Sequence, residues 1–153
     1  MITVFWNVHG PVVIEALPPG GTWTADYFNN VIIEKLAQSD PYRRAIAQKQ
    51  AFVVHMDNAP VHRAATVKQK MWQIGMHNAE HPAYSPDLAP SDFYLFGNLK
   101  SKIRGLEFES AEEIKEWIIA QFDLIPADEL KRVFEEWEMR LRACIERGGD
   151  YVE

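Results

Sequence analysis

Hydrophobic residues follow two periods along the chain, and these periods predict its secondary structure. Alternating apolar and polar residues predict an antiparallel hairpin with strands over 2–6 and 12–17, joined by a turn ending at Gly10. A short apolar run predicts a buried strand over 51–56, and a brief strand fits 76–79. Three- and four-residue spacing predicts helices that begin at capping residues or prolines: Thr24, Pro60, Ser91, Ser110 and Pro126.

The strands and helices alternate along the chain, which indicates one mixed sheet with flanking helices. Residues 81–90 contain three prolines and are expected to form a loop, because proline removes a backbone donor. Asp40 and Pro41 are expected to break the first helix, with a polar stretch after them. No linker or repeat interrupts the pattern, so residues 1–153 are predicted to form a single α/β or α+β domain.

Composition narrows the class of protein. Hydrophobic residues make up 47% of the chain and charged residues 25%, which is usual for a soluble domain. No apolar run reaches the roughly 20 residues of a membrane span, and the N-terminus does not resemble a signal peptide. The single cysteine, Cys144, excludes an internal disulfide. We therefore expect no membrane association, no secretion, and a location in the nucleus or in bacterial cytoplasm.

The net charge of −6 conceals an uneven distribution. Residues 1–105 hold ten basic and eight acidic residues, whereas residues 106–153 hold six and fourteen. Local basic groups, more than total charge, determine affinity for DNA, so the charge neither supports nor excludes a nucleic-acid partner.

Two aspartates lie at positions where catalytic or metal-binding residues are often found. Asp57 ends the apolar strand 51–56, and Asp92 lies in the first turn of a helix after the proline-rich loop. Two ionised carboxylates on a rigid framework suit Mg²⁺ and two-metal phosphoryl transfer. Taken singly, each aspartate is also a common turn or capping residue. Four histidines are alternative metal ligands, but their spacing matches no zinc pattern: His55, His62, His77 and His81.

Two longer motifs resemble those of mariner-type transposases. The string from His55 to His62, HMDNAPVH, resembles their second catalytic motif, and 81–96, HPAYSPDLAPSDFYLF, resembles the third. Thirty-four residues separate Asp57 from Asp92, a spacing typical of the mariner group whose third carboxylate is aspartate. The resemblance covers nearly the whole chain.

The resemblance implies a ribonuclease H-like fold that cuts and joins DNA with Mg²⁺ or Mn²⁺. Asp57 and Asp92 would be two of three catalytic, metal-binding carboxylates, supported by Asn58 and His62. Asp87 would be a turn former in the loop. Transposon-end DNA would be the partner, contacted through basic residues at five positions: Lys68, Lys70, Lys100, Lys102 and Arg104.

In the family, the first catalytic aspartate and a helix-turn-helix region lie upstream of the part that matches Met1–Trp6. The chain is therefore expected to be a partial catalytic domain without its first strand, with a helical C-terminus, and incomplete on its own for cleavage and strand transfer. The alternative is a non-enzymatic transposon remnant that folds, self-associates or binds DNA weakly. Whether this chain is itself an enzyme stays open at this point.

A missing central strand leaves two segments, 2–6 and 51–56, without a hydrogen-bonding neighbour. Either these segments pair directly, or a second chain supplies the pairing. The apolar hairpin 1–17 favours the second solution, so a homo-oligomer is expected.

Overall fold

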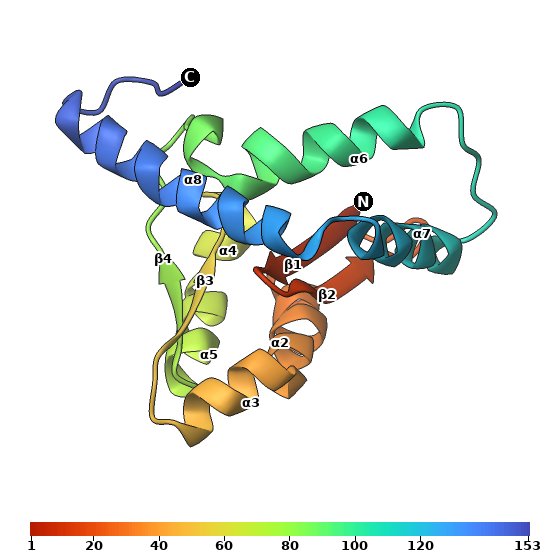
Figure 1. Cartoon of the computed structure of the whole chain (residues 1–153). Coiled ribbons are helices and arrows are strands. Elements are labelled where there is room, and N and C mark those ends of the chain that lie inside the picture. Colours follow the sequence, from red (N-terminus) through yellow and green to blue (C-terminus); the bar gives the residue numbers. More distant parts are fainter. The chain divides into compact units, whose positions relative to one another are not determined.

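The hairpin predicted at the N-terminus is present in the computed structural model, which describes residues 1–153. β1 (Ile2–Asn7) and β2 (Gly10–Ala16) pair with each other, and their two-residue connection requires them to run antiparallel (Figure 1). Gly10 has φ +121°, a conformation that side-chain-bearing residues rarely adopt.

The chain forms two compact units. The first comprises Met1–Phe5 and Val12–His81, and the second comprises Trp6–Pro11 and Pro82–Glu153. The hairpin thus contributes its base to the first unit and its tip to the second.

The helices of the first unit form one group ahead of β3 (Phe52–His55) and another after it. The first group ends with α3 (Asp40–Ala47), a helix over a segment for which only a polar stretch was predicted. Asp40 and Pro41 end one helix as expected, but they also begin the next, with the Ser39 hydroxyl accepting from the backbone N–H of Tyr42. The elements in order are α1 (Ala25–Tyr27), the π-helix η1 (Phe28–Ile33), α2 (Glu34–Gln38), α3 (Asp40–Ala47), β3 (Phe52–His55), α4 (Pro60–Arg63), α5 (Ala65–Gln73) and β4 (Met76–Ala79).

β3 and β4 lie side by side (Figure 1). They are parallel, and Phe52 lies opposite Met76. The brief strand expected at 76–79 is thereby confirmed. The two sheets remain separate, so of the two alternatives the direct pairing of segments 2–6 and 51–56 does not occur. Each segment already has a strand partner on one side, in β2 and in β4 respectively.

The core of the first unit is built from side chains of β2, η1, α2, β3, α5 and β4. Phe28, Ile32 and Ile33 are fully buried, and Leu36 is nearly so. These residues recur at three- and four-residue spacing, which explains why the helical region packs on one side.

The second unit is mainly helical. Its elements are the 3₁₀ turn η2 (Pro86–Leu88), the π-helix η3 (Ser91–Leu95), α6 (Phe96–Ile103), α7 (Ala111–Asp123) and α8 (Ala127–Glu146). Ser110 caps α7 as predicted, since its hydroxyl accepts from the N–H of Glu113. The predicted cap at Ser91 is wrong: Pro90 takes the cap position, and the Ser91 hydroxyl accepts from Trp6 Nε1 at 3.0 Å.

The aromatic core of the second unit surrounds Trp6. Its ring centroid lies 5.2 Å from that of Phe134 and 6.1 Å from that of Phe122. The apolar face predicted along α8 is buried at Leu130 and Val133 but is 79% exposed at Ile145. That helix therefore packs from Leu130 as far as Arg140, which stacks on Phe93, while Ile145 near its end is exposed to solvent.

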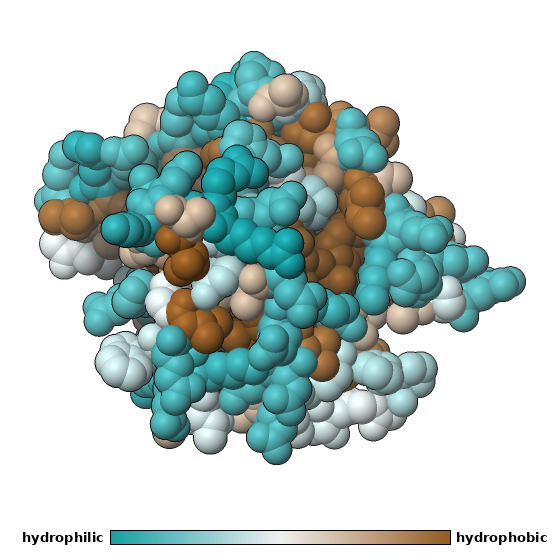
Figure 2. Space-filling model, turned by 90° about the horizontal axis from the view of Figure 1, so that it is seen from below, coloured by the Kyte–Doolittle hydropathy of each residue, from teal (hydrophilic) through white to brown (hydrophobic).

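Hydrophilic residues cover most of the face drawn in Figure 2, and hydrophobic residues reach the surface in smaller patches. The most exposed large side chains include Trp72 and Tyr84, at 76% and 99%. No helix is both long and apolar enough to cross a membrane.

Candidate metal and DNA-processing site

Asp57 follows β3 directly, and its side chain is fixed by its own loop. Its Oδ1 accepts from the backbone N–H of Ala59 at 3.0 Å and lies 2.9 Å from Nδ1 of His62. The same Nδ1 lies 3.2 Å from the Asp57 carbonyl oxygen. Both oxygens are acceptors, so Nδ1 of His62 carries the hydrogen. Oδ2 accepts no hydrogen bond, and the side chain is 67% exposed.

His62 is itself held by the core. Its ring centroid lies 5.0 Å from that of the fully buried Phe28, and its side chain is only 15% exposed. Ala64 leaves the helical conformation, with ψ 138°, and this divides the single helix predicted after Pro60 into α4 and α5. The short helix α4 thus turns His62 back onto Asp57.

Asn58 supports the neighbouring loop. Its side-chain nitrogen donates to the carbonyl oxygen of His81 at 2.7 Å. Asn78 Oδ1 accepts from the backbone N–H of Met56 at 3.2 Å, which ties the end of β3 to β4. The segment around Asp57 is therefore anchored to the chain that follows β4.

His55 and His81 meet beside this segment. His55 Nε2 lies 3.1 Å from His81 Nδ1, and the two rings are nearly perpendicular. Burial, together with repulsion from His81, lowers the pKa of His55 to about 4, although Asp57 acts in the opposite direction. Parallel pairing of β3 with β4 brings these histidines together, and the linear sequence gives no spacing that predicts this.

Asp92 lies in the π-helix η3 of the second unit and is exposed. Its backbone N–H donates to the carbonyl oxygen of Ala89 at 2.9 Å. π-Helical turns are rare in proteins, and those that occur are often at functional sites. The hydrogen bond from Trp6 to Ser91 places the first residue of this turn against the aromatic core.

The loop before Asp92 is held by α8 and the C-terminal residues. Asp87, predicted as a turn former, lies in the 3₁₀ turn η2 but is also buried, and its Oδ2 accepts from the backbone N–H of Val152 at 2.9 Å. Trp137 Nε1 donates to the Leu88 carbonyl oxygen at 2.8 Å. Arg140 stacks on the Phe93 ring, 4.3 Å from its centroid. Sequence reasoning missed this anchoring role of Asp87, because its partner is 65 residues away.

The five basic residues predicted to contact DNA differ in their surroundings. Lys70 donates to the carbonyl oxygen of Asn29 at 2.8 Å and pairs with Glu34 at 2.5 Å, so it would have to leave these partners to reach a phosphate. The other four are exposed and hold no ion pair: Lys68, Lys100, Lys102 and Arg104.

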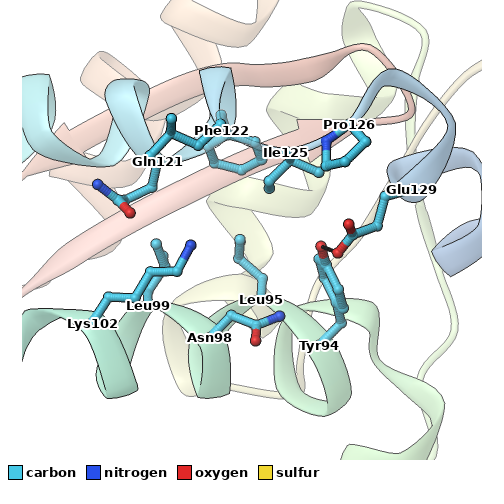
Figure 3. Close-up of a pocket in the computed structure, with 11 residues that line it drawn as sticks. Tyr94, Leu95, Asn98, Leu99, Lys102, Gln121, Phe122, Ile125, Pro126 and Glu129 are labelled. Atoms are coloured by element: carbon cyan, nitrogen blue, oxygen red, sulfur yellow. Dashed lines mark hydrogen bonds between the residues drawn. The ribbon is translucent and has the colours of Figure 1, made fainter.

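A small cavity of about 120 Å³ lies within the second unit, bounded by η3, α6, α7 and the start of α8 (Figure 3). Leu95, Phe122 and Ile125 give it an apolar wall, and Lys102 lies at its edge. The Tyr94 hydroxyl donates to Glu129, and burial together with that carboxylate raises the pKa of Tyr94. Neither Asp57 nor Asp92 lines this cavity.

Each of the two carboxylates has, by itself, the chemistry of a ligand for a hard divalent cation. Asp57, in the first unit, offers an oxygen without a hydrogen-bond donor, and Asp92, in the second unit, is exposed. Oxygen ligands of this kind are those that Mg²⁺ prefers, with water completing its shell. No group of three or more His, Cys, Asp or Glu residues is gathered in the structure to hold a metal by itself.

Comparison with known proteins assigns the chain to a family. Residues 20–115 match the model for the DDE superfamily endonucleases. Over its full length the chain is 30% identical to the Mariner Mos1 transposase of Drosophila mauritiana and spans 45% of that protein. It is 25% identical to the human histone-lysine N-methyltransferase SETMAR and spans 22% of it.

Solved structures agree with this assignment. The Mos1 transposase catalytic domain with raltegravir and manganese matches the whole chain with a TM-score of 0.87 at 28% identity, and 77% of that domain is covered. The Mos1 strand transfer complex matches with a TM-score of 0.82 at 30% identity, over 44% of that chain. The chain belongs to the DDE superfamily endonucleases, and the predicted ribonuclease H-like α/β fold is confirmed.

Proposed function

We infer that this chain is a transposase catalytic-domain segment that acts in metal-dependent cleavage and strand transfer of DNA. The observation that carries the proposal is the fixed carboxylate of Asp57. Its Oδ1 is held by Ala59 and His62, while Oδ2 faces no donor, at the end of a strand in a chain that matches a transposase catalytic domain throughout. Nothing in the comparisons favours a non-enzymatic remnant.

Asp57 and Asp92 would together hold Mg²⁺ or Mn²⁺, the ions found in solved Mos1 catalytic domains. When bound, such an ion supplies Lewis-acid activation of the attacking oxygen and neutralises charge on the phosphate. His62 acts as a positioning residue, because its Nδ1–H orients the Asp57 carboxylate. Asn58 holds the adjoining loop through the His81 carbonyl oxygen.

DNA is the proposed substrate and partner, since Mos1 has been solved in a paired-end complex with its left transposon end. Exposed, unpaired basic side chains would contact phosphates: Lys68, Lys100, Lys102 and Arg104. Lys70 would join them only after leaving Glu34. Contacts of this kind read no sequence, so binding should weaken steeply with salt.

Self-association is a further part of this proposal. Each sheet has only two strands, so β1 and β3 each carry an edge that is not paired within the chain. Such edges accept strands from other chains. Light scattering coupled to size-exclusion chromatography tests this, and a strictly monomeric chain at high micromolar concentration would exclude it.

Nicking of supercoiled DNA with Mg²⁺ or Mn²⁺ tests the proposed activity. We expect Asp57→Asn and Asp92→Asn each to lower the rate by about 100-fold or more, because each removes a charged metal ligand. Asp26→Asn and Asp123→Asn are matched controls, exposed aspartates in the first and second units, and should leave the rate unchanged. Equal rates in all four variants would refute the assignment.

A further inference from the structure

Two histidines of the first unit lie against each other beside β3. His55 stands at the end of β3, and His81 follows β4 by two residues. Parallel pairing places His55 opposite Ala79, so the two imidazoles meet at the same end of the sheet. Their Nε2 and Nδ1 atoms are 3.1 Å apart, and both side chains are partly buried.

This separation suits a metal as well as a hydrogen bond. Zinc bonds to imidazole nitrogen are about 2.0–2.1 Å long, and a tetrahedral angle then holds two such nitrogens about 3.3 Å apart. The observed separation of 3.1 Å is close to that value. Each ring can move its proton to its other nitrogen, which frees both lone pairs at the point of approach.

The loop around the pair is held by hydrogen bonds of its own. Asn58 donates to the carbonyl oxygen of His81, and Met56 donates to Asn78 between the two strands. A metal here would therefore meet preformed ligands and would not have to organise the loop.

The donor atoms of the histidine pair also differ from those of the Asp57 carboxylate. Imidazole nitrogen suits zinc, nickel and copper, whereas carboxylate oxygen suits magnesium and manganese. The histidine pair and Asp57 can therefore bind different metal ions, although His55 and Asp57 are close in the sequence.

We propose that His55 and His81 form a second metal site, which takes Zn²⁺ or a similar imidazole-preferring ion with water completing its coordination. Its ligands are different side chains from the two carboxylates proposed for DNA cleavage. Because it joins the end of β3 to the chain after β4, the bound ion stabilises the native first unit.

Calorimetric titration of the intact chain with Zn²⁺ tests the site. We expect one ion per chain, and binding about tenfold weaker or more in His55→Gln and in His81→Gln, since even outer-shell partners contribute that much to metal affinity. His77→Gln is the matched control, an exposed histidine on β4, and should bind as the unmodified chain does. Asp57→Asn should also retain binding, which separates this site from the proposed catalytic one.

A second measurement requires no variant. In long-range ¹⁵N–¹H spectra of the unmodified chain, Zn²⁺ should shift His55 Nε2 and His81 Nδ1, while His9 and His77 remain in place. Loss of zinc binding in Asp57→Asn would assign the ion to Asp57 and His62 instead. Shifts at His77 equal to those at His55, or no binding by the unmodified chain, would show that the pair is only a hydrogen bond. Any of these results would overturn the proposal.

Discussion

The two segments that carry Asp57 and Asp92 are held in place by different means. Asp57 takes both of its hydrogen-bond partners from the next five residues, Ala59 and His62. The loop before Asp92 depends on contacts with residues 49 and 65 positions away, which join Leu88 to Trp137 and Asp87 to Val152. A short strand–loop–helix segment thus sets the first carboxylate, whereas the second requires the C-terminal part of the chain to be folded.

The largest expected effect is on the free energy of unfolding. It comes from a core residue that supports His62, the partner of Asp57. Phe28→Ala should lower the free energy of unfolding by about 3–5 kcal/mol, because it empties a fully buried site next to the His62 ring. Urea denaturation measures the change. Trp72→Ala, at a side chain 76% exposed, should change stability by less than about 0.5 kcal/mol. Similar losses in both variants would contradict the burial described above.

The loop before Asp92 is held partly by one hydrogen bond from a distant residue, and a single substitution can remove that bond. Val152→Pro removes the N–H that Asp87 accepts and should destabilise the second unit by about 1–3 kcal/mol, since both Asp87 carboxylate oxygens are then buried without a partner. Hydrogen exchange should accelerate over residues 86–93 and stay unchanged over 57–62. Asp150→Ala, at an exposed neighbour, is the control. Faster exchange in both segments would remove the distinction between them.

A change at His62 should have a smaller effect on stability and a specific effect on function. His62→Gln should lower the nicking rate by about tenfold, because the carboxylate loses its orienting donor. The free energy of unfolding should fall by only about 1 kcal/mol. Exchange near residues 86–93 serves as the control and should not change. A variant with the full nicking rate would show that Ala59 alone orients Asp57.

The smallest effect concerns a contact in which neither carboxylate takes part. Burial and the neighbouring Glu15 raise the pKa of Tyr27, whose hydroxyl donates to Glu15 at 3.4 Å. A raised pKa in the folded state gives stability that is complete below the unfolded value of about 10 and is lost as pH rises above it. Tyr27→Phe should therefore flatten the decline in melting temperature above about pH 10. An unchanged slope would show that Tyr27 does not contribute to it.

Residues with local partners were predictable from the sequence, and residues with distant partners were not. Thr24 and Ser110 cap their helices as expected, since a cap needs only the next three residues. α3 was missed because arginines and glutamines make residues 43–50 polar overall, although Ser39 was a readable start signal and Tyr42 and Ile46 lie four residues apart on one face. The burial of Asp87 and the meeting of His55 with His81 follow from chain folding over long separations, which hydrophobic periodicity does not encode.

The central claim is that these two differently supported carboxylates serve one metal-dependent reaction. Paramagnetic broadening by Mn²⁺ in NMR spectra of the intact chain tests it most directly. We expect substoichiometric Mn²⁺ to broaden the amide signals of residues 57–59 and 91–93 together, and Asp57→Asn to remove both effects. Broadening at one segment that persists when the other carboxylate is replaced would contradict the account.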